Sequence, residues 1–139
     1  MSAKVTVKTE MKDADMIVEA LKLMGIPADQ IRQDADGLKI DGYLGKDWGV
    51  AHILIPKAFH KGYADVGFVK NGGVYDLHVD HIDTHTLSRK LGHEGRKFED
   101  LANQWYAAAV SQKTLKNQGF NTTIKRDGDR LKVLASMPY

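Results

Sequence analysis

Residues 63–80 read YADVGFVKNGGVYDLHVD, and this stretch decides the fold. Apolar and β-branched residues flank the sequence Asn-Gly-Gly at 71–73, which readily adopts the positive backbone angles of a tight hairpin turn. Two strands joined by such a turn must be antiparallel. The second strand alternates, so every other residue is apolar and the remaining ones form the face expected to meet solvent, namely Asp76, His78 and Asp80.

Regular elements are predicted on both sides of this hairpin. Val5 and Val7 alternate with polar residues and indicate a strand. A helix follows over residues 14–24, capped by Asp13 and ended by Gly25. A second, longer helix is expected from Phe98, because apolar residues recur at steps of three and four up to Leu115, and Gly119 is expected to end it. Residues 120–136 contain a final hairpin that is expected to close the sheet.

This order of elements predicts an α+β fold. We expect an antiparallel sheet of about five to seven strands, with two amphipathic helices packed on one face, in a single domain spanning residues 1–139. The chain has no cysteine, which excludes disulfides and thiolate metal sites. It also shows no signal-peptide pattern and no apolar run long enough for a membrane span, so we expect a cytoplasmic protein with no membrane contact.

The cluster YDLHVDHIDTH at 75–85 is the clearest candidate for chemistry. Histidine and aspartate bind zinc, manganese and iron, so a metal-dependent hydrolase is one hypothesis, with His78, Asp80, His81 and His85 as the ligands. However, His81 could join the others only if the strand breaks or bulges there. The favoured interpretation is a polar strand face followed by a polar turn, with no metal or other cofactor.

A basic segment, THTLSRKLGHEGRK at 84–97, follows and is expected to be the least structured part of the chain. Its four cations, Arg89, Lys90, Arg96 and Lys97, could contact the phosphates of a nucleic acid or nucleotide. The net charge of +2 argues neither for nor against such a partner. Other signatures of catalysis are weak, because the serines lie in no strained glycine-flanked turn and GYLGKDWG lacks the spacing of a phosphate-binding loop.

Three stretches carry a family resemblance. They are VTVKTEMKDADMIVEALKLMG at 5–25, the hairpin at 63–80, and QWYAAAVSQKTLKNQGFNTTIKRDGDRLKVL at 104–134. Together they resemble the hypothetical chloroplast open reading frame thirty-five family, a domain of unknown function in plastids and cyanobacteria with phage-encoded members. The resemblance implies a small α+β domain with no established activity. The positions that fit the family pattern are Tyr63, Asp65, Gly67, Phe68, Tyr75, Asp80, Gln104, Tyr106, Gly119 and Phe120. The histidines at 78, 81 and 85 and the basic segment depart from it.

The leading hypothesis is therefore a small, non-enzymatic interaction or adaptor protein that binds another protein, as an accessory or host-directed factor if it is phage-encoded. Its contact surface is expected on the polar face of the 63–80 hairpin and on the basic segment. The residues expected in this surface are Asp65, Asp76, His78, Asp80, Arg89, Lys90, Arg96, Lys97 and Tyr106. A nucleic-acid or nucleotide binder using the 89–97 segment is the alternative, and the final strand could pair with a second copy at a sheet edge.

Overall fold

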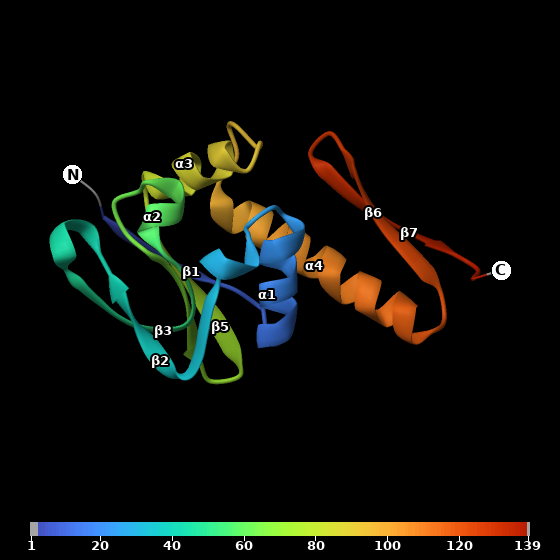
Figure 1. The fold of residues 1–139 in the computed structure, drawn as a ribbon, viewed down its shortest axis with the longest axis horizontal. Coiled ribbons are helices and arrows are strands. Elements are labelled where there is room, and N and C mark those ends of the chain that lie inside the picture. Colours follow the sequence, from blue (N-terminus) through green and yellow to red (C-terminus); the bar gives the residue numbers. More distant parts are fainter. Residues whose placement is uncertain (1–2, 139) are drawn as a thin grey trace.

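A computed structural model describes residues 3–138 of the chain (Figure 1). Its main sheet has five antiparallel strands in the order β1-β5-β4-β3-β2, which are β1 (Lys4–Lys8), β2 (Arg32–Asp41), β3 (Asp47–Ile55), β4 (Val66–Asn71) and β5 (Val74–Asp80). A separate two-stranded sheet consists of β6 (Asn121–Asp127) and β7 (Arg130–Ser136). The helices are α1 (Ala14–Leu23), α2 (Lys57–His60), α3 (Asp83–Lys90) and α4 (Phe98–Asn117), with short 3-10 turns at Ala28–Gln30 and Tyr43–Gly45. The α+β class predicted from the sequence is confirmed.

The β4–β5 hairpin forms as its turn sequence predicted. Asn71 pairs with Val74 across the turn, and Gly72 has a φ of 65°, a backbone angle that favours glycine. However, β4 begins at Val66 rather than at Tyr63, so the first residues of the expected strand are not strand. The Asp83 side chain, described below, accepts hydrogen bonds from the backbone N–H groups of Tyr63 and Ala64 and holds this segment in a turn.

One face of the sheet packs against α1, α3 and α4 and forms the main core. Phe68, Leu77 and Val79 come from the sheet, while Leu21, Leu87 and Leu101 come from the helices, and all of them are fully buried. The α1 helix begins where expected, because the Asp13 carboxylate accepts hydrogen bonds from the backbone N–H groups of Asp15 and Met16. The two predicted amphipathic helices therefore form, and a third lies beside them.

That third helix, α3, covers residues 84–90 of the segment expected to be the least structured part of the chain, while residues 91–97 are turns and loop. Its buried face carries Thr84 and Ser88 as well as Leu87, so an apolar stripe is hard to see in the sequence. Both hydroxyls are satisfied inside the protein. Ser88 donates to the carbonyl of Thr84, and the Thr84 hydroxyl accepts from the backbone N–H of Phe98 at 2.8 Å.

The C-terminal hairpin corrects a second expectation, since it does not join the main sheet. Figure 1 shows β6 and β7, in red, lying against α4 and away from the other strands. Its inner face contributes Ile124 and Leu131, which are half-buried against the main core. Hydrogen bonds also hold the hairpin to the rest of the protein. Gln104 on α4 donates to the carbonyl of Asp129 in the turn, and Arg126 on β6 contacts His93.

Candidate functional site

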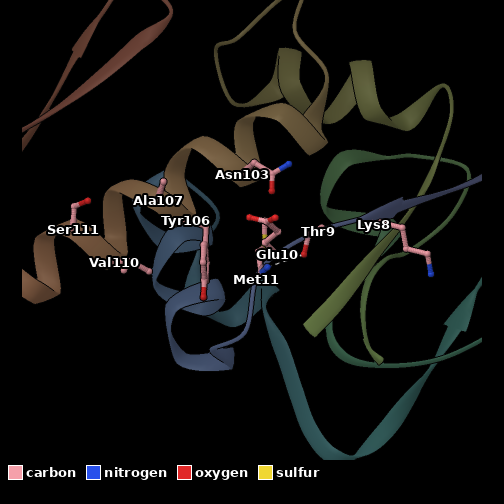
Figure 2. Close-up of a pocket in the computed structure, with 9 residues that line it drawn as sticks. All are labelled: Lys8, Thr9, Glu10, Met11, Asn103, Tyr106, Ala107, Val110 and Ser111. Carbon is pink, nitrogen blue, oxygen red and sulfur yellow. Dashed lines mark hydrogen bonds between the residues drawn. The ribbon is translucent and has the colours of Figure 1, made fainter. Parts of the chain in front are cut away.

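An open groove of about 680 Å³ lies between the segment that follows β1 and the middle of α4 (Figure 2). Its lining residues are Lys8, Thr9, Glu10 and Met11 on one side and Asn103, Tyr106, Ala107, Val110 and Ser111 on the other. The second group recurs at steps of three and four residues, so it forms one face of α4. The opposite face of the same helix is buried in the core, through Leu101, Trp105 and Ala109.

Tyr106 holds the two walls of the groove together. Its hydroxyl accepts hydrogen bonds from the backbone N–H groups of Lys12 and Asp13, at 3.1 and 3.2 Å. These bonds link α4 to the start of α1 across more than 90 residues of sequence. The side chain is half-buried, whereas the neighbouring Trp105 is buried. The structure therefore brings one predicted site residue, Tyr106, into this groove.

Several polar groups of the groove are already engaged in hydrogen bonds within the protein. Lys8 points back over the sheet to Asp76, with 2.8 Å between Nζ and Oδ2, and this hydrogen bond holds the pKa of Asp76 below its usual value. The Thr9 hydroxyl is used by the backbone, since it donates to the carbonyl of Tyr75 and accepts from Met11 N–H. Glu10 and Asn103 are exposed at the rim, and Figure 2 shows them facing each other across the groove. No histidine contributes to the lining, so Ser111 has no imidazole base there.

The aspartates predicted to face solvent are buried, which corrects the expected contact surface. Asp65, Asp76 and Asp80 are at most 8% exposed. Asp80 accepts hydrogen bonds from the N–H groups of Ile82 and Asp83 at the start of α3, at 2.8 and 3.0 Å. Asp65 accepts from the N–H groups of Asp41 and Lys57. Asp65 and Asp80 thus bind loop backbone, while Asp76 accepts from the side chains of Lys8 and Asn71 on the neighbouring strands. Their burial leaves little of these carboxylates exposed to an external partner.

A fully buried pair, Asp83 and His60, was not singled out from the sequence. The Asp83 carboxylate accepts from the backbone N–H groups of Tyr63 and Ala64 at 2.9 Å, and His60 Nε2 lies 3.4 Å from Oδ2. Burial alone would raise the pKa of Asp83, but the hydrogen bonds from His60, Tyr63 and Ala64 hold it below its usual value. Gly62 passes close to both side chains, because a Cβ built there would lie 2.3 Å from the His60 ring and 2.7 Å from Asp83. The pair therefore fixes the turn that precedes β4.

The histidines of the 75–85 cluster do not converge. His78 is half-buried on β5, and burial together with the charge of Lys4 lowers its pKa. His81 Nδ1 accepts from the N–H of Ala3, and His85 is exposed on α3. Within residues 3–138 no three histidine or acidic side chains are arranged to hold a metal ion. The geometry therefore gives no support to a metal-dependent hydrolase.

The four cations of the basic segment also point to different neighbours. The Lys90 ammonium lies 4.8 Å from the centre of the Phe59 ring, and Arg96 donates to Gln104 Oε1 at 3.0 Å. Arg89 lies 4.0 Å from Glu94, while Lys97 precedes α4 and is exposed. Because Lys90 and Arg96 contact other parts of the protein, the segment does not form one free phosphate-binding cluster.

Comparisons with known proteins returned nothing: no family model, no curated protein and no solved structure matches this chain. None of the helices within residues 3–138 combines the length and apolar character needed to cross a membrane. The assignment of a role therefore rests on the site itself.

The groove could not be found from the sequence, since its walls are separated by more than 90 residues. Glu10, Asn103, Ala107 and Val110 carry no motif. The one signal was on α4, where Val110 stands off the core stripe and is 37% exposed. An exposed valine on an otherwise amphipathic helix is a weak hint of a second contact surface.

Proposed function

We propose that this chain is a non-catalytic binding protein that holds an extended segment of a partner polypeptide in the groove between β1 and α4. The observation that supports it is the position of the groove beside an edge strand. Within the main sheet β1 pairs only with β5, so alternate residues of β1 direct their backbone groups away from the sheet. The groove continues from the end of this strand to the exposed face of α4.

An edge strand next to a helix-walled groove is suited to strand addition. In this mode of recognition the added peptide gains main-chain hydrogen bonds from the edge, and alternate side chains enter the groove. Proteins commonly block such an edge with lysine side chains. Here Lys8 is held by Asp76 over the neighbouring strand, which leaves Lys4, exposed at the other end of β1, as the second lysine of this edge strand. Val5, also on β1, is 36% exposed, so the strand presents an apolar side chain as well.

The chemistry of the groove favours a particular kind of segment. Ala107 and Val110 form an apolar wall of small side chains, while Glu10 and Asn103 lie at the rim. A peptide with apolar residues at alternate positions and a basic or hydrogen-bonding residue opposite Glu10 would match this pattern. No reactive group of the protein is required for such binding.

The test is selection of a displayed library of random linear peptides against the full chain, followed by amide chemical-shift mapping with a selected peptide. We expect shifts in residues 4–11 and in residues 103–111. Val110→Glu should abolish binding because it places a charge in the apolar wall, and Thr6→Pro should weaken it because proline distorts the edge. Val50→Glu is the matched control, since Val50 is 48% exposed on β3 and is not a groove residue.

Two results would count against this function. Selected peptides could map to another surface, or Val110→Glu could bind as well as the native chain. A ligand whose affinity falls steeply with salt, and for which the Val110→Glu change is neutral, would instead favour the nucleic-acid alternative.

A further inference from the structure

The β6–β7 hairpin is an unusual element because it is a sheet of only two strands. Isolated hairpins are marginally stable in water. This one packs on the body through Ile124 and Leu131, yet its last strand leaves apolar side chains in solvent. Leu134 is 48% exposed and Met137 is 52% exposed. Within the described residues β7 pairs only with β6, so its other edge has no strand beside it.

We propose that β7 pairs antiparallel with β7 of a second copy of this chain, so that two hairpins join into one four-stranded sheet. Such a contact is self-complementary and closes as a two-fold dimer. It uses a different surface from the groove, and it does not depend on what the groove binds.

The register of this pairing follows from the side chains. If Val133 lies opposite Val133 of the second copy, Arg130 lies opposite Ser136, and the whole of β7 is paired with no overhang. The hairpin register already places Ile124 beside Val133. The dimer therefore contains one unbroken row of Ile124, Val133, Val133 and Ile124 on the inner face. A shift by one residue would turn the second copy over and destroy this row.

The charges agree with the same register. Lys132 lies opposite Leu134 of the second copy, and Arg130 lies opposite Ser136, so no cation faces another cation across the seam. A register centred on Lys132 would place two lysines directly opposite each other. Pro138 follows the strand in sequence and cannot extend the pairing.

The edge of β7 fits a second copy better than the edge of β6 does. In β6 the sequence NTTIKRD contains one large apolar residue, whereas RLKVLAS in β7 contains Leu131, Val133 and Leu134. The Arg126 side chain on β6 also contacts His93 at 3.2 Å, which holds that strand to the body of the protein.

Sedimentation velocity of the full chain, from about 1 to about 100 µM, tests the assembly. We expect a dimer that dissociates on dilution. Leu134→Lys should raise the dimer dissociation constant about tenfold, since it creates two symmetric lysine–lysine contacts across the seam. Leu134→Thr, which introduces no charge, is the control and should leave a dimer. The double variant Lys132→Glu with Leu134→Lys should restore association, because opposite charges then meet.

A second measurement does not depend on the stability of the hairpin. The chain has no cysteine, so Val133→Cys introduces a single thiol at the two-fold axis, and mild oxidation should link two chains. Thr123→Cys, on the other strand of the same hairpin, should not cross-link at a comparable rate. A native chain that stays monomeric at the highest concentration would overturn the proposal. So would a dimer that is insensitive to Leu134→Lys, or equal cross-linking by the two cysteine variants.

Discussion

Replacing Asp83 by asparagine tests whether the buried aspartate–histidine pair holds the fold together. The Asp83 carboxylate is fully buried and receives hydrogen bonds from the backbone N–H groups of Tyr63 and Ala64. Asparagine keeps the size of the side chain but replaces one acceptor oxygen with a donor NH₂ group. At least one buried N–H would then face another donor, and the contact with His60 would lose its charge.

The expected loss is about 3–4 kcal/mol in the free energy of unfolding. A hydrogen bond to a charged group contributes about 1.5–3 kcal/mol, and the bonds from Tyr63 and Ala64 both lose the charge of their acceptor. Domains unfold with an entropy of roughly 2.1 cal/mol/K per residue, so for 139 residues this loss corresponds to a drop in Tm of about 10–14 °C. It is a large part of a total stability of about 5–15 kcal/mol.

Urea titration at pH 7, followed by circular dichroism, measures the change if the m-value stays the same. Asp36→Asn is the matched control, because Asp36 is exposed on β2 and the same chemical change there should cost less than about 0.5 kcal/mol. A loss of less than about 1 kcal/mol for Asp83→Asn would refute the structural role. An increase in stability would show that the charge is kept for activity at the expense of folding.

Two further predictions concern the same core and the attached hairpin. Gly62→Ala should destabilise the protein by about 1–3 kcal/mol, because the added methyl group collides with the buried His60 ring. Gly73→Ala is the control and should change the unfolding free energy little, because its methyl group meets only open space. Equal effects of the two substitutions would contradict the proposed collision. Burial and the charge of Arg126 lower the pKa of His93 below its usual 6.5. As the pH falls below about 6.5, His93 therefore takes up a proton in the unfolded chain before it does so in the folded protein. This uptake favours the unfolded state, so the free energy of unfolding decreases until the pH reaches the lower pKa of His93 in the folded protein. His93→Gln should flatten this part of a stability–pH curve, and an unchanged slope would show that His93 does not titrate in this way.

The parts of the fold that could be predicted are those in which local sequence and tertiary packing agree. The helix from Ala14 has a side-chain cap, an apolar stripe and a terminal glycine, and it forms within one or two residues of its predicted bounds. The turn at 71–73 likewise determines both strands of its hairpin. In these places each short stretch contains the information that its structure needs.

One error occurred where a buried polar side chain is satisfied from further along the chain. The α3 helix buries Thr84, whose hydroxyl accepts from the backbone N–H of Phe98, whereas Asp80 and Ser88 bond to backbone groups within four residues of themselves. The separation of β6–β7 from the main sheet has a similar cause. Its alternating residues would suit either place, and only the packing of Ile124 and Leu131 against α4 and the core decides between them.

The same hydrogen bonds account for acidic side chains in and near the cluster at 75–85. Asp65, Asp80 and Asp83 each accept hydrogen bonds from two different backbone N–H groups of neighbouring loops. Both oxygens of Asp65 and of Asp83 are used in this way, whereas Asp80 accepts both bonds on Oδ1 and its buried Oδ2 has no hydrogen-bond partner among the described residues. Moving any of the three would leave buried donors unpaired. Acidic residues therefore occur close together in this part of the sequence because they hold the loops around β4 and β5 in place. Within the described residues the edge strands are β1 and β2 of the main sheet and β6 and β7 of the hairpin, and binding through the edges of β1 and β7 requires no change in the buried network.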